Sequence, residues 1–222
     1  MARGKLKRIY RFCLEGLNQL IWPRVCINCG EGISGGNSEL CKDCWDKLLL
    51  SVGGDYCGRC GRQVSRYAIV GGRCPDCQDK KFHFDGVARG GVYEGALKKM
   101  ILAFKNGRTE LDLVLGYLAN SALVVSEFYE QIELFVPVPL HWSRRFIRGC
   151  NQSLVLAKRL KHSKAKISTD LVRIRRTKMQ RDSMSAAARA KNVAGAFAVR
   201  KGHNFKDKLI CLVDDIKTTG AT

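Results

Sequence analysis

The stretch LICLVDDIKTTGAT, residues 209–222, decides the fold of this chain. Its first five residues, 209–213, are mainly aliphatic and β-branched, which predicts a buried strand of a parallel sheet. Asp214 and Asp215 then place two carboxylates at the carboxyl end of that strand. Ligands of open α/β sheets bind at this edge, where a loop of small residues can direct backbone N–H groups at a phosphate. The stretch therefore predicts an α/β fold with a sugar-phosphate site.

Two other interpretations of this stretch are weaker. An aspartate pair can simply cap a turn, with the threonines filling it. A nucleoside triphosphate is disfavoured because the sequence lacks the GxxxxGK[ST] loop that holds polyphosphate. The order of strand, acidic pair and TTGxT resembles the loop of type I phosphoribosyltransferases that binds 5-phosphoribosyl 1-pyrophosphate (PRPP). The PRPP-binding residues expected from this order are Asp214, Asp215, Thr218, Thr219, Gly220 and Thr222.

Cysteine spacing predicts metal binding. Eight of the eleven cysteines form four CxxC pairs: Cys26/Cys29, Cys41/Cys44, Cys57/Cys60 and Cys74/Cys77. Each pair can present two thiolates to one ion, so tetrahedral Zn²⁺ needs two pairs and four pairs make two sites. We expect sequential pairing, 26/29 with 41/44 and 57/60 with 74/77, although an interleaved pairing remains open. Four thiolates leave no open coordination position, so both zinc ions are expected to be structural rather than catalytic.

A redox role for these pairs is the weaker alternative. A thioredoxin-like site needs one CxxC pair at a strand-to-helix junction, and four pairs within some fifty residues do not match that arrangement.

Positive charge is concentrated in the second half of the chain. The net charge is +19, and residues 144–208 contain nineteen lysines and arginines but three acidic residues. A basic region of this kind favours a polyanionic partner, either nucleic acid, with single-stranded DNA the main candidate, or a phosphorylated substrate. A solvated basic surface remains the alternative.

A second anion site is expected in HWSRRFIRGCNQS, residues 141–153, which follows an apolar run at 134–138. We interpret it as a basic loop between a strand and the N-terminus of a helix at 154–160, where backbone N–H groups and guanidinium groups both attract anions. The candidate pyrophosphate residues are Arg144, Arg145, Arg148 and Asn151.

Three domains are expected: a basic amphipathic helix within residues 1–23, a double zinc ribbon at 24–80, and an α/β domain at 84–222. A length of 222 residues is enough for one large domain or for one medium domain plus a small module. In the α/β domain, apolar spacing predicts helices at 97–104 and 111–125. Strands are expected at 84–93, 134–138, 171–174, 195–199 and 209–213, and a mobile loop or lid with a short helix at 175–192.

Targeting signals are not apparent. The sequence contains no run of about 18 uninterrupted apolar residues, so it does not predict a transmembrane helix. Polar residues at 15, 18 and 19 interrupt the apolar stretch that a signal peptide would need. The lack of these signals, together with cysteines that must stay reduced to bind metal, predicts a cytoplasmic protein.

Taken together, the segments resemble the ComF family of competence-associated, phosphoribosyltransferase-like proteins. The resemblance is carried by the cysteine pairs and by YEGALKKMILAFKNG, VPVPLHWSRRFIRGCNQS, RRTKMQRDSMSAAARAKNVAGAF and VDDIKTTGAT. It implies a zinc-ribbon module followed by a type I phosphoribosyltransferase-like parallel sheet, PRPP with Mg²⁺ if the protein is active, and a link to DNA uptake and its machinery proteins. In the family the PRPP loop continues into a helix and a further strand, so residues 84–222 are expected to be a truncated form of that domain.

The resemblance identifies neither the acceptor substrate nor a catalytic residue, and it does not decide whether PRPP is consumed or only bound. Two other function classes stay open. One is a nucleic-acid-binding zinc-ribbon protein that uses the phosphoribosyltransferase fold as a non-catalytic scaffold, and the other is a structural adaptor.

Overall fold

A computed structural model of the chain describes residues 24–33, 39–77, 80–177, 185–203 and 205–217. The helix expected within residues 1–23 lies outside the described residues, as do Thr218, Thr219, Gly220 and Thr222 of the expected PRPP loop. The chain divides into two compact units, Met1–Leu50 and Ser51–Thr222, which are described separately below. Among the described residues, no helix combines the length and the apolar character that crossing a bilayer requires.

The first unit contains a tight turn and a helix. An antiparallel bridge between Val25 and Gly32 closes the turn, and helix α2 (Lys42–Val52) begins directly after Cys41. Ion pairs one helical turn apart, Lys42 with Asp46 and Lys47 with Asp43, lie along the exposed side of α2. Such exposed pairs add little to the stability of a helix, because solvent screens both charges.

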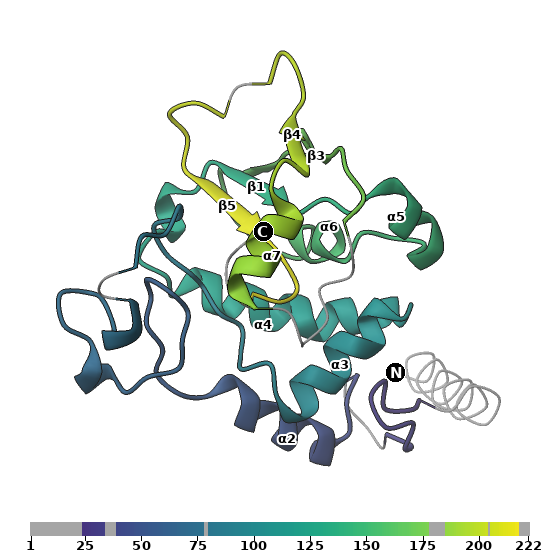
Figure 1. Ribbon diagram of the computed structural model, residues 1–222. Helices are drawn as coiled ribbons and strands as arrows, with labels where there is room; N and C mark the ends of the chain where they lie inside the picture. Colours follow the sequence, from purple (N-terminus) through teal and green to yellow (C-terminus); the bar gives the residue numbers. More distant parts are fainter. Residues whose placement is uncertain (1–23, 34–38, 78–79, 178–184, 204, 218–222) are drawn as a thin grey trace, which may run out of the picture. The chain divides into compact units, whose positions relative to one another are not determined.

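A parallel sheet forms the centre of the second unit (Figure 1). Strand β1 (Leu134–Pro137) pairs in parallel with β2 (Lys166–Ile167) on one side and with β5 (Ile210–Val213) on the other. All four residues of β1 are buried, as expected for a central strand covered on both faces. The structure therefore confirms the mixed α/β fold with a parallel sheet, and β5 is the strand expected at 209–213. The expectation that this strand is buried is wrong, because β5 lies at the edge of the described sheet, where Val213 is buried but Leu212 is 53% exposed.

Helices cover this sheet, and a second, two-stranded sheet lies apart from it. Helix α6 (Gln152–Ala157) packs against β1, β5 and α4 (Asp112–Val124). The four apolar residues predicted to line one face of the helix at 97–104 are buried. The remaining elements are α3 (Gly95–Lys105), α4 (Asp112–Val124), α5 (Trp142–Arg148), α6 (Gln152–Ala157), α7 (Ala186–Val193), β3 (Leu171–Arg173), β4 (Phe197–Val199) and 3-10 turns at Arg66–Ala68, Pro75–Cys77, Thr109–Leu111 and Tyr129–Gln131.

The strand expected at 84–93 is wrong. This segment has no strand structure, and its glycines serve close packing instead. A Cβ at Gly86 would lie 2.9 Å from the ring of Phe128, and one at Gly91 would lie 2.6 Å from Leu97. The glycines of this segment therefore mark positions where the backbone passes directly against neighbouring elements.

The basic loop expected at 141–153 is also wrong, because its first half is helix α5. His141 caps the start of α5, where its ring accepts a hydrogen bond from the backbone N–H of Ser143. Gly149, with φ of 76°, ends the helix in the left-handed conformation that glycine adopts most easily. The arginines at 144, 145 and 148 therefore lie on a helix, and their directions follow the helical repeat.

The strands expected at 171–174 and 195–199 form, but they do not extend the parallel sheet. They pair with each other in antiparallel register, Val172 opposite Ala198. The two-residue strand β2 had no recognisable strand pattern in the sequence, because it is short and both of its residues are exposed.

Candidate functional site

Four buried cysteines come together in the second unit, and we refer to Cys57, Cys60, Cys74 and Cys77 as the second cysteine site. The Sγ atoms of Cys57 and Cys77 lie 3.7 Å apart, as do those of Cys60 and Cys74. A zinc ion that holds four sulfurs tetrahedrally at about 2.3 Å keeps them about 3.8 Å from one another. A disulfide would need about 2.05 Å. The arrangement therefore fits a zinc ion and not a pair of disulfides.

The local sequence explains how the first CxxC pair of each site forms its turn. In the second cysteine site, the N–H of Gly61 donates to the carbonyl of Cys57 at 2.7 Å, and Gly61 has φ of 76°. In the first unit, Gly30 donates to the carbonyl of Cys26 at 2.8 Å and has φ of 82°. A glycine directly after the second cysteine is thus required by backbone conformation, since other residues avoid positive φ.

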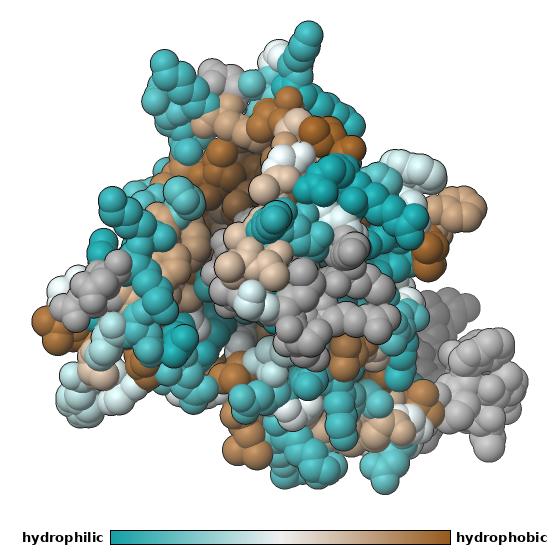
Figure 2. All heavy atoms as spheres, viewed as in Figure 1, coloured by the Kyte–Doolittle hydropathy of each residue, from teal (hydrophilic) through white to brown (hydrophobic). Residues whose placement is uncertain are grey.

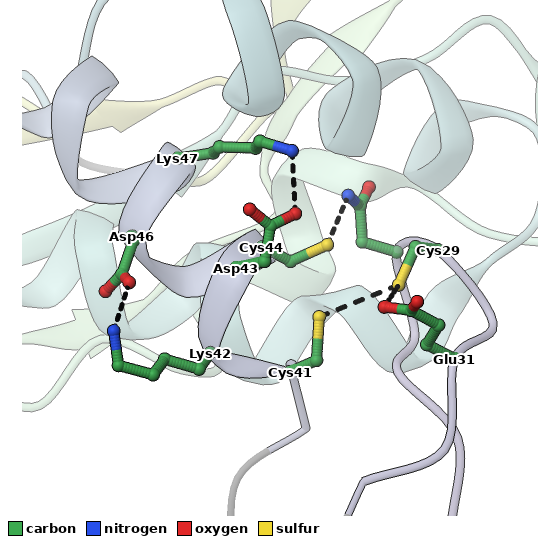
Figure 3. Close-up of polar contacts among 9 residues, drawn as sticks. Cys29, Glu31, Cys41, Lys42, Asp43, Cys44, Asp46 and Lys47 are labelled. Carbon is green, nitrogen blue, oxygen red and sulfur yellow. Dashed lines mark hydrogen bonds and ion pairs between the residues drawn. The ribbon is translucent and has the colours of Figure 1, made fainter.

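The first cysteine site, formed by Cys26, Cys29, Cys41 and Cys44, is built from this turn and from the start of α2 (Figure 3). The Sγ atoms of Cys29 and Cys41 lie 3.7 Å apart, the spacing that tetrahedral zinc needs. The side-chain amide of Asn28 donates to Sγ of Cys44 at 3.2 Å. Cys29 is exposed, whereas the four cysteines of the second cysteine site are buried.

Both sites group the cysteines in the sequential pairing, not in the interleaved one. Burial raises the pKa of Cys44 and that of Cys77 to about 12, and neighbouring thiols add to the effect. These thiols hold their protons at neutral pH unless a cation displaces them. Zinc binding therefore releases protons, and both groups of four cysteines fit structural zinc ions.

A second cluster lies at the carboxyl end of β5, and we refer to it as the sheet-edge site. Asp214 and Asp215 follow the last strand residue directly. Oγ of Ser153, at the start of α6, donates to Oδ1 of Asp214 at 3.0 Å. Nζ of Lys105, the last residue of α3, lies 3.1 Å from Oδ1 of Asp215. Two helices thus hold the two carboxylates separately.

The carboxyl group of Asp214 has an unusual environment. Desolvation by surrounding protein atoms, together with the adjacent carboxylate of Asp215, raises the pKa of Asp214 to about 6. The residue as a whole is exposed, whereas its Oδ1 accepts hydrogen bonds from Oγ of Ser153 and from the backbone N–H of Asp215. Paired acids with a perturbed pKa at a sheet edge are typical of binding and catalytic sites.

The expected pyrophosphate residues do not point the same way. Arg144 is half-buried and donates to the backbone carbonyl of Thr177 at 2.6 Å, whereas Arg145 is exposed. Asn151 caps α6 by accepting from the N–H of Ser153 at 3.2 Å, and it donates to the carbonyl of Val138 at 3.1 Å. Arg148 is half-buried. Desolvation is the main cause that lowers the pKa of Arg144, and repulsion by the nearby charge of Arg148 lowers it further. Asn151 therefore positions the start of α6, and its side chain is already used for that purpose.

Arg173 joins this cluster, although the sequence did not single it out. It donates to Oγ1 of the buried Thr177, and its guanidinium lies 5.2 Å from the centre of the Phe197 ring. Desolvation and then the charge of Arg144 lower the pKa of Arg173, while Asp214 acts in the opposite direction. Among the described residues, its Nε is one of five buried side-chain atoms without a hydrogen-bond partner. Arg173 thus lies near enough to interact with both Asp214 of the sheet-edge site and the positive charge of Arg144.

Three further residues of the sheet-edge region escaped sequence reasoning: Lys105, Ser153 and Lys217. Each contacts a partner that lies far away in the sequence, so local patterns carried no signal for them. Arg173 could have been found only as one member of the basic region at 144–208.

Comparison with known proteins agrees with this architecture. A double zinc ribbon domain matches residues 17–78. The chain is 30% identical over 204 residues to Competence protein F of Haemophilus influenzae, covering 89% of this chain and 86% of that protein. It is 24% identical over 193 residues to Competence protein ComFC of Bacillus subtilis, covering 84% and 75% of the two chains. No solved structure matches the chain. With two zinc-binding cysteine groups, an α/β unit and this degree of identity along most of its length, the chain belongs to the ComF family of competence proteins.

Proposed function

We propose that this protein binds PRPP at the sheet-edge site as a phosphoribosyltransferase-like member of the ComF family. The observation that carries the proposal is the carboxylate pair Asp214 and Asp215 at the carboxyl end of β5, beside the start of α6. Crevices at this end of a parallel sheet bind nucleotides and sugar phosphates. Carboxylates are suited to accept hydrogen bonds from ribose hydroxyls, which is the role we assign to this pair.

The positive groups around the pair suit the rest of the ligand. The guanidinium of Arg173 interacts with both Asp214 and the guanidinium of Arg144, and the buried Nε of Arg173 lacks a partner among the described residues. A pyrophosphate would supply the negative charge that this cluster lacks, in charge-assisted hydrogen bonds. Carboxylate oxygens also suit Mg²⁺, which would neutralise part of the diphosphate charge when bound with PRPP. The residues expected to hold the 5′-phosphate, Thr218 to Thr222, remain a prediction.

The biological setting follows from the relatives. Two of them are named as competence proteins. We therefore propose a role in competence, linked to DNA uptake and its machinery, and a cytoplasmic location, where thiols stay reduced and able to bind zinc.

Calorimetric titration with PRPP and Mg²⁺ tests the proposal. We expect binding by the unmodified protein and a loss of at least about tenfold in affinity for Asp214→Asn with Asp215→Asn, corresponding to ~1.4 kcal/mol. Asp207→Asn is the matched control, since Asp207 is exposed and its φ of 59° suits asparagine. Undetectable PRPP binding by the unmodified protein would refute the proposal. Pyrophosphate release in the same samples separates catalysis from binding alone.

Single-stranded DNA binding is a second candidate function, favoured by the surface of α5. Trp142 is 75% exposed and Phe146 is 89% exposed, close to the exposed Arg145. In Figure 2, hydrophobic atoms project among hydrophilic ones near α5, at the right of the view. Exposed aromatic rings beside arginines are typical of surfaces on which unpaired bases stack. This surface could serve a protein that uses the phosphoribosyltransferase fold as a scaffold.

Salt-dependent binding to single-stranded DNA tests this candidate. Replacing Arg145 and Arg148 by alanine should lower affinity on any sequence and reduce the slope of log affinity against log salt by about 2 units. Replacing Trp142 should lower affinity without changing that slope, because stacking releases no counterions. The control removes the exposed pair Arg200 and Lys201. Equal losses for both pairs would mean that the whole basic region binds non-specifically.

A further inference from the structure

Lys217 connects the two sites of the second unit. It lies two residues after Asp215, and its Nζ donates to the backbone carbonyl of Cys60 at 2.8 Å, across 157 residues of sequence. The same ammonium group lies 5.4 Å from the centre of the Phe84 ring. The chain that leaves β5 beyond the carboxylate pair is thus attached to a zinc-ligand residue and to the segment beside it.

Both partners of Lys217 are held in place by the turn that contains the cysteines. The carbonyl of Cys60 belongs to the Cys57–Cys60 turn, whose shape depends on the bond from Gly61 to Cys57. Arg59, within the turn, donates to the carbonyl of Phe84 and lies 5.8 Å from the centre of its ring.

Further contacts attach residues 84–89 to the same turn. The N–H of Val87 donates to the carbonyl of Gly58 at 2.7 Å, and Arg89 donates to the carbonyl of Gly61 at 3.2 Å. The acceptor and the ring that Lys217 uses are therefore both positioned by the second cysteine site.

We propose that the second cysteine site is a structural part of the sheet-edge site. Lys217 ties the segment that follows Asp215 to the Cys57–Cys60 turn, so that a zinc-filled turn fixes the path of residues 214–217. Lys105 attaches Asp215 to α3, and Lys217 provides a second attachment of this segment, to the carbonyl of Cys60. Lys217 is a positioning residue in this role. Its consequence for PRPP rests on the proposed function, whereas the attachment itself does not.

By thermodynamic linkage, the attachment couples ligand binding at the carboxylates to formation of the Cys57–Cys60 turn. If the formed turn favours the binding-competent path of residues 214–217, then ligand binding at the carboxylates must favour the formed turn by the same factor. PRPP is therefore expected to tighten zinc binding at the second cysteine site, and we expect the tighter binding to appear as slower zinc release. The first cysteine site belongs to the other compact unit and provides an internal reference.

Hydrogen–deuterium exchange on the zinc-loaded protein tests the attachment without any ligand. Lys217→Met removes the ammonium group and keeps the chain length, and Lys208→Met is the control, an exposed lysine before β5. We expect faster exchange at 214–217 in the first variant only, with two zinc ions per chain retained in both. Unchanged exchange in Lys217→Met would overturn the proposal.

Calorimetry and zinc release then test the coupling. Lys217→Met should weaken PRPP binding by about tenfold, the size expected for one charge-assisted hydrogen bond, and should abolish the slowing of zinc release by PRPP. Unaltered affinity together with unaltered zinc release would overturn the coupling. Absence of PRPP binding by the unmodified protein would instead count against the proposed function, and the exchange experiment would still decide the attachment.

Discussion

Asp214 shows how one residue of the sheet-edge site can oppose stability while filling the binding role that we propose for it. Desolvation and the charge of Asp215 raise its pKa to about 6, above the ordinary value of 3.8. A raised carboxyl pKa means that the folded state binds the proton more tightly than the unfolded state does. The resulting stabilisation is complete below about pH 4 and is lost as pH rises through about 6.

Asp214→Asn removes this pH dependence. We expect the variant to gain thermal stability relative to the unmodified protein at pH 7.5, but little at pH 4, because the unmodified carboxyl is protonated there. PRPP affinity should be lower in the variant at pH 7.5. Thermal unfolding at both pH values measures the difference, and a variant that is less stable at pH 7.5 would show that Ser153 and the Asp215 amide stabilise the ionised carboxylate more than desolvation penalises it.

At the scale of an element, the two cysteine turns differ in how tightly their glycines are packed. Gly61 and Gly30 occupy equivalent positions and both have positive φ. A Cβ at Gly61 would lie 2.9 Å from Cγ1 of Val87, whereas nothing lies within 4 Å of one at Gly30. The second turn is therefore constrained by packing as well as by backbone conformation.

Substituting each glycine by alanine separates these two effects. Gly30→Ala should cost about 1–2 kcal/mol through backbone strain alone. Gly61→Ala should cost a further ~1–3 kcal/mol through overpacking against Val87. Thermal unfolding and the rate of zinc release measure both costs. Equal effects of the two substitutions would mean that Val87 moves aside freely.

At the scale of the whole molecule, the two cysteine sites belong to different units and differ in exposure. Cys29 is exposed and Cys41 is half-buried, whereas all four cysteines of the second cysteine site are buried. A chelator must reach the thiolates, and a proton must reach a sulfur to displace the metal.

Zinc release to a chromogenic chelator should therefore occur in two phases of about one equivalent each. The faster phase belongs to the first cysteine site and should disappear in Cys29→Ser. Acidification should speed both phases, since zinc holds deprotonated thiolates and a fall in pH favours the thiol form. Loss of the slower phase in Cys29→Ser would reverse the assignment.

Local sequence determined a large part of this protein. The CxxC spacing indicated two zinc sites, because two thiols three residues apart converge on one ion whatever surrounds them. The repeat of Leu97, Met100, Ile101 and Phe104 predicted α3, and the apolar run before Asp214 predicted β5. These features depend on residues that are close together in the chain.

Tertiary structure alone decided the rest, because the deciding contacts join distant residues. The glycines of 84–93 resembled a strand until the neighbours packed on them were known. Helix α5 is an exception, because its caps, His141 and Gly149, are local residues whose signal the sequence interpretation missed. Ser153 meets Asp214 across 61 residues, and Lys217 meets Cys60 across 157. No local pattern encodes such pairs, since their proximity follows from how the sheet, α6 and the second cysteine site pack together.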